Sequence, residues 1–88
     1  MGAYIGGSAF AMASNVAEGN ILITIVILKK FSPGELKALE FEIEKIQRDV
    51  RSEVPPQDDS MLLQKRNRKI SRLSQALLVL RNFQMQKR

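Results

Sequence analysis

Apolar residues recur at alternating three- and four-residue steps in two long segments of the chain, 33–53 and 60–87. This spacing places the apolar side chains of a helix along one narrow seam, as in coiled coils. The two seams consist of Leu36, Leu39, Ile43, Ile46 and Val50 in the first segment, and Ile70, Leu73, Leu77 and Leu80 in the second. The pattern therefore predicts two amphipathic helices that pack seam to seam.

Turn and cap residues mark the ends of these helices. The sequence from Ser32 to Glu35 fits a capping box with Pro33 at the first helical position. The Pro55-Pro56 pair ends the first helix, and one of residues 58–60 can cap the second. We expect an antiparallel helical hairpin over residues 31–88.

The run Ile21–Leu28 has a different character, because it is uncharged and rich in β-branched residues. Such a run favours a buried β-strand, here residues 20–30, over a helix. Residues 1–19 fit either a flexible leader or a first strand, with Tyr4–Ala13 pairing against Ile21–Leu28. Residues 1–11 also fit a leader ahead of an alternative start, since Gly6-Gly7-Ser8 resembles a linker. The expected fold is mainly α: a coiled-coil-like two-helix hairpin preceded by a short N-terminal β-strand or β-hairpin.

Both helices carry apolar residues outside their seams. Phe41 lies nearly opposite the first seam, and Leu78 lies on an otherwise uncharged polar face of the second helix. Val79 and Phe83 widen the second seam to an arc of roughly 200°, more than one neighbouring helix covers. Either the N-terminal segment or another subunit can cover this excess. The predicted partner interface is therefore Phe41, Leu78, Val79 and Phe83.

Charge is distributed unevenly along the chain, whose net charge is +5. Residues 32–54 contain six acidic and four basic residues, whereas residues 60–88 contain eight basic residues and no acidic one. We expect Glu42 or Glu44 to lie near Lys69 or Arg66 across the hairpin, which leaves a basic surplus. That surplus fits phosphates, anionic lipid or an acidic partner protein.

The basic run 64–72 is the strongest candidate for nucleic-acid binding. Its predicted phosphate contacts are Lys65, Arg68, Lys69 and Arg72. No aromatic residue lies within the run, and the chain has neither an RRM-type signature nor a zinc-finger spacing. A solvated or Glu-paired helix face is the simpler interpretation of the same residues.

The composition excludes several classes of function. The chain contains no cysteine and no histidine, which removes disulfides and the common zinc sites. It has no nucleophile elbow, phosphate-binding loop or paired-carboxylate pocket, so we expect neither an enzyme nor a cofactor. The apolar stretch before Lys29 is interrupted by glycine, asparagine and Glu18 and falls well short of the ~20 residues of a membrane span, so a membrane anchor is disfavoured. Lack of cysteine fits a reducing, intracellular compartment, either the cytoplasm or the nucleus.

The small size of the chain favours assembly with a partner. A chain of 88 residues builds a single small core, and without disulfides or metal its usual source of added stability is a partner. The sequence predicts a non-catalytic protein–protein interaction module, a small adaptor or assembly subunit of a homo- or hetero-oligomer that acts through helix packing. The alternative prediction is a basic nucleic-acid-binding module.

Overall fold

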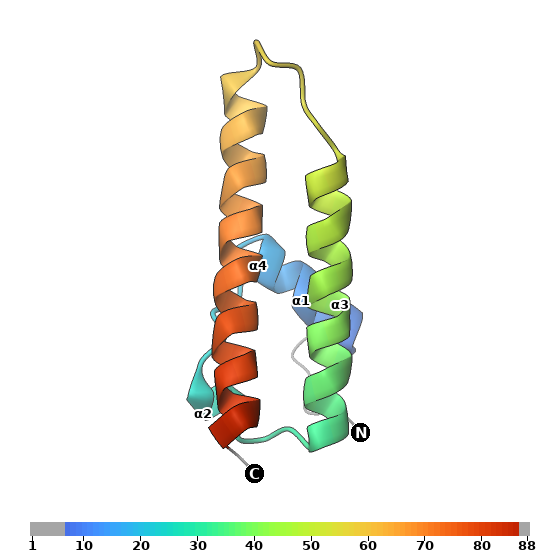
Figure 1. Cartoon of the computed structure of the whole chain (residues 1–88), viewed down its shortest axis with the longest axis vertical. Helices are drawn as coiled ribbons and strands as arrows, with labels where there is room; N and C mark the ends of the chain where they lie inside the picture. The colour runs from blue at the N-terminus through green and yellow to red at the C-terminus, as the bar shows by residue number, and fades with distance from the viewer. Residues whose placement is uncertain (1–6, 87–88) are drawn as a thin grey trace.

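The described part of the chain, residues 7–86 of a computed structural model, is built from helices and contains no strand. The elements are α1 (Ala9–Ala17), α2 (Ile25–Leu28), α3 (Pro33–Ser52) and α4 (Ser60–Gln86). The long helices α3 and α4 run antiparallel, while α1 crosses them at mid-height and α2 lies beside the end of α4 (Figure 1). The resulting molecule is elongated, with principal extents of 46 × 24 × 19 Å.

The caps of the long helices follow from the sequence. The Ser32 hydroxyl accepts a hydrogen bond from the Glu35 amide (3.2 Å), and the Glu35 carboxylate accepts one from the Ser32 amide (2.8 Å). This confirms the predicted capping box at the start of α3. At the start of α4 the carboxylate of Asp59 accepts from the Leu62 amide at 3.1 Å. The mainly helical fold is thus confirmed.

The predicted β-strand at residues 20–30 is wrong. Residues 21–24 have no regular secondary structure, and Ile25–Leu28 forms the single helical turn α2. The Thr24 hydroxyl starts that turn by accepting from the Ile27 amide at 3.4 Å. Ile23 and Leu28 are buried without a sheet, because they pack into a core formed by α1, α3 and α4.

The predicted hairpin partner of that strand, Tyr4–Ala13, is helical from Ala9 onward. Residues 1–6 lie outside the described part of the chain, and α1 begins at Ala9 after Ser8, whose hydroxyl accepts from the Ala11 amide. At the other end Gly19 has a φ of +84°. Its amide donates to Val16, and the Asn20 amide donates to Asn15, which is the Schellman arrangement that ends a helix.

The core lies in one half of the hairpin only. Every buried residue of α3 and α4 lies at or before Ile43 or at or after Leu73. We call α1, α2 and residues 33–43 and 73–86 the closed half, and residues 44–72 the open half. Gln47 marks the border, since its side-chain amide donates to the Ile70 carbonyl (3.2 Å) and to the Ser74 hydroxyl (2.6 Å).

Candidate interaction surfaces

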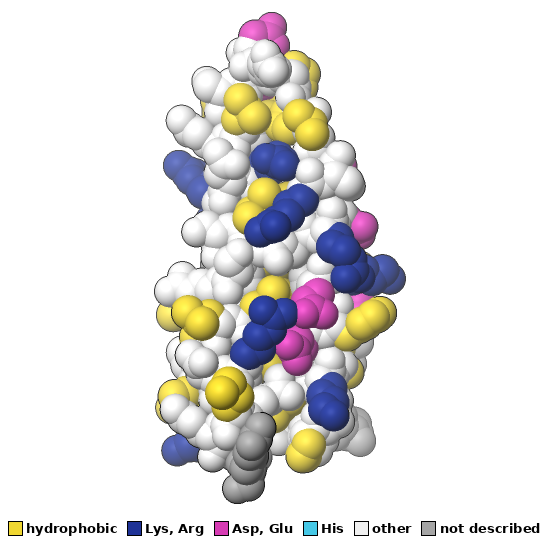
Figure 2. Space-filling view, viewed as in Figure 1, with side chains coloured by type: hydrophobic (Ala, Val, Ile, Leu, Met, Phe, Trp, Pro, Cys, Tyr) yellow, Lys and Arg dark blue, Asp and Glu magenta, His cyan; other side chains and the backbone are white. Residues whose placement is uncertain are grey.

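A hollow of about 670 Å³ lies in the open half, where α3 and α4 lack a third helix among the described residues. Its walls combine apolar side chains with a ring of charges. The lining residues are Glu18, Val50, Glu53, Val54, Pro55, Leu62, Lys65, Arg66, Arg68, Lys69 and Arg72. The face drawn in Figure 2 is the one away from α1, and it also has hydrophobic side chains between the two helices in the upper half, with basic side chains beside them.

One of these cations closes the end of α3. The guanidinium of Arg66 donates to the carbonyls of Val50 (3.3 Å), Arg51 (3.0 Å) and Glu53 (3.0 Å). Carbonyls in the last turn of a helix lack intrahelical donors and carry partial negative charge, so a cation there is favourable. Arg66 therefore stabilises the turn. The sequence predicted that it would lie near Glu42 or Glu44, and the structure shows it bound to these carbonyls instead.

Two more cations hold the end of α1 against α4. Arg72 donates from Nη1 to the Ala17 carbonyl at 3.0 Å, and Lys69 forms an ion pair with Glu18 at 3.1 Å. A Cβ on Gly19 would come within 2.9 Å of the Arg72 guanidinium, so the glycine allows this close approach. One edge of the hollow is thus fixed by contacts between α1 and α4.

The remaining cations of the hollow are Lys65 and Arg68. Both are exposed, and neither forms a hydrogen bond or ion pair with another residue in the range 7–86. Of the four predicted phosphate contacts, the structure thus keeps two available and engages Lys69 and Arg72 within the chain. Nucleic-acid binding by this run stays a prediction with a smaller set of free charges.

The structure leaves only part of the predicted partner interface exposed. Phe83 is only 7% exposed and belongs to the core, and Val79 is partly buried against it, so Phe83 is not available as a contact surface. The wide apolar arc of α4 is covered from within, because α1 and α2 pack on it in addition to α3. Phe41 and Leu78 remain exposed, at 55% and 60%, on different helices.

The seam residues fall into two groups. Those in the closed half are buried: Leu36, Leu39, Ile43, Leu73, Leu77 and Leu80. Ile46, Val50 and Ile70, the seam residues of the open half, are only partly buried. The same heptad spacing therefore gives a core in one half and a half-covered surface in the other.

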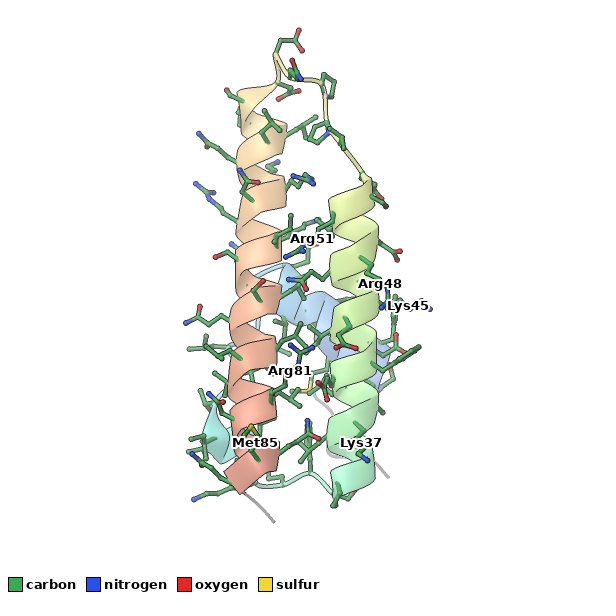
Figure 3. All side chains as sticks on the ribbon, in the orientation of Figure 1. Lys37, Lys45, Arg48, Arg51, Arg81 and Met85 are labelled. Carbon is green, nitrogen blue, oxygen red and sulfur yellow. The ribbon has the colours of Figure 1, made fainter. Side chains whose placement is uncertain are left out.

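An ion-pair cluster joins α3 and α4, mainly in the closed half. Arg81 reaches from α4 to α3 (Figure 3), where it donates from Nε to Glu40 at 2.8 Å and from Nη2 to Glu44. Gln84 donates to the second oxygen of Glu40 at 3.1 Å. The hydrogen bond from Arg81 lowers the pKa of Glu40 below its usual value, although partial burial opposes this. Glu40 and Glu44 of α3 are therefore already paired with side chains of α4.

Sequence reasoning did not single out Val54 and Leu62, which are 75% and 44% exposed at the open end. The signal that could have found them is the absence of any predicted element able to cover residues 44–72. Within residues 7–86, no helix has the length and hydropathy required to cross a bilayer. The same residues bring no three His, Cys, Asp or Glu side chains together as a metal site requires.

Comparison with known proteins gives no match: no family model fits the chain, and neither a curated protein nor a solved structure is significantly similar to it. The functional interpretation therefore depends on geometry and chemistry.

Proposed function

We propose that the chain is a non-catalytic protein–protein interaction module, a small adaptor or assembly subunit that binds through its open half. The observation that supports this most directly is the absence of any buried residue between 44 and 72, over a stretch where the helices still carry seam residues. Exposed apolar surface rimmed by polar groups is typical of a binding site. Phe41 of α3 and Leu78 of α4 are additional exposed contact points.

Cross-linking tests the proposal at chosen positions. A photoreactive amino acid replaces Leu62 in the hollow or, as the control, Lys45, whose side chain points away from the hairpin on the outer side of α3 (Figure 3). We expect a product of discrete mass from position 62 and none from position 45. Light scattering on the purified chain then tells self-association from binding of another protein. A monomer that gives no discrete product from position 62, 41 or 78 would contradict the proposal.

A second candidate is the basic nucleic-acid-binding module. The free cations Lys65 and Arg68 favour it, because phosphate binding needs positive side chains without an internal partner. Titration of duplex and single-stranded oligonucleotides at increasing salt tests it. Affinity that falls steeply with salt supports this candidate, and affinity that does not change with salt removes it.

A further inference from the structure

The hollow of the open half begins where α1 ends. α1 packs on both long helices, and Glu18, which follows its last residue, forms one edge of the hollow. Above this point the groove between α3 and α4 continues with no helix of residues 7–86 over it (Figure 1). The stretch of α4 from Ser60 to Arg72 is about 20 Å long, which accommodates three to four turns of a second helix.

The walls of the hollow define an amphipathic occupant. Val50, Val54 and Leu62 present apolar surface toward it, and Leu62 and Val54 are well exposed when nothing covers them. These residues lie where two helices already face each other, so a third helix that places its apolar stripe there would extend the packing of the closed half.

The charges at the edge of the hollow define the polar side of that occupant. Five cations and only two carboxylates line it, and the cations Lys65 and Arg68 have no partner among the described residues. A helix with carboxylates flanking its apolar stripe would meet these cations, whereas a basic helix would be repelled.

We propose that the hollow binds an acidic amphipathic helix of a partner protein, which lies in the groove between α3 and α4 beyond the end of α1. This inference rests on the proposed function and specifies the chemistry of its partner. A second copy of the chain fits the hollow poorly, because α4 has no acidic residue, Glu40 and Glu44 of α3 already bind Arg81, and the other acids of α3 are interspersed with four basic residues. A polynucleotide would leave the apolar walls uncovered.

The test uses defined probes and the full chain. The first probe is a fluorescent peptide of about 16 residues with leucine along one helical stripe and glutamate beside it, and its control is a scrambled peptide of the same composition. Anisotropy titrations at moderate salt should give a dissociation constant at least about tenfold lower for the patterned peptide. Amide chemical-shift changes in labelled protein should concentrate in residues 44–72.

Matched charge variants locate the site. The double variant Lys65→Gln with Arg68→Gln removes two cations at the hollow, and Lys45→Gln with Arg48→Gln removes two from the outer side of α3 (Figure 3). All four side chains are free of described partners or lie exposed on a helix exterior, so the fold should persist, which circular dichroism checks. We expect the first pair to weaken peptide binding about five- to tenfold and the second less than about twofold.

Three other results would each contradict the inference, and each has a different meaning. Equal losses from both pairs would mean that the whole charge of the chain attracts the peptide and that the hollow is not the site. Tighter binding of a duplex oligonucleotide, lost with Lys65 and Arg68, would assign the hollow to nucleic acid. Failure of the peptide together with a discrete cross-link from position 62 would remove the acidic partner and leave the interaction module standing.

Discussion

The two halves of the hairpin share the same pair of helices and the same apolar spacing, yet they differ in what surrounds them. In the closed half, α1 and α2 add further layers to α3 and α4, and Leu39, Ile43 and Leu80 are fully buried. In the open half the equivalent positions, Ile46 and Ile70, stay partly exposed. The difference shows that a heptad seam in a two-helix hairpin is only half of a core and that a third element completes it.

Truncating matched isoleucines should give the largest difference between the halves. We expect Ile43→Ala to lower the free energy of unfolding by about 2–5 kcal/mol, because it leaves a cavity in a packed core. Ile70→Ala removes a partly exposed side chain and should cost less than about 1.5 kcal/mol. Urea unfolding of both variants measures the two losses. Equal losses would show that the core continues through both halves.

The next prediction concerns the contact that holds the end of α1 against α4. Gly19 has φ +84°, and a Cβ there would meet Arg72, so Gly19→Ala should lower the free energy of unfolding by about 1–2 kcal/mol. Gly34→Ala is the matched control, because a Cβ at Gly34 meets nothing within 4 Å and alanine favours a helix. Thermal unfolding of the two variants should shift in opposite directions. A loss at Gly34 as large as that at Gly19 would contradict this account of α1.

The helix caps should separate global from local unfolding. Ser32→Ala removes the capping box at the end of α3 that lies in the closed half, and we expect a global loss of about 1 kcal/mol. Asp59→Ala removes the cap at the open end, where the first turn of α4 should fray without a matching global loss. Hydrogen exchange should then rise at Leu62 and Leu63 and stay unchanged at Leu80. Faster exchange at Leu80 in Asp59→Ala would mean that the halves unfold together.

The smallest expected effect comes from the ion-pair cluster, because Arg81 is about half exposed, with 51% of its side-chain surface accessible. Since the folded-state pKa of Glu40 is lowered, its contribution is fully present above its unfolded pKa and is lost as pH falls through the lower, folded pKa. At neutral pH Arg81→Gln should cost no more than about 1 kcal/mol. Unfolding at pH 7 and near pH 3 should show that the difference from the native chain shrinks in acid. A constant difference would mean that Arg81 acts by packing alone.

The helical hairpin could be predicted because its signals are local. Helical periodicity, the Ser32 to Glu35 box and the Pro55-Pro56 pair each act within a few residues, so no tertiary context was needed. The strand prediction failed for the opposite reason. Strand propensity measures how a side chain packs in a sheet, and Ile21–Leu28 has no neighbouring strand to pack with.

The sequence also contains the cap residues and apolar spacing of helix α1, but the strand prediction was preferred for this region. Ser8 and Gly19 mark its two ends, and its buried residues, Met12, Ala13, Val16 and Ala17, follow helical spacing. The candidate site was predictable only as a basic run. Which cations serve the fold depends on where two helices end in space, and sequence spacing does not place the Ala17 carbonyl beside Arg72.

The position of the core along the chain also bears on how the protein is made. The apolar run Ile21–Leu28 emerges from the ribosome early, while the α4 residues that cover the same core, Leu73 to Phe83, emerge only after the whole of α3 and the turn. Domains acquire stable structure once their contacting segments have all been synthesised, and exposed β-branched runs aggregate in the meantime. The early helices therefore cannot complete this core until the second half of α4 has been synthesised, and the apolar run stays uncovered by α4 during that interval.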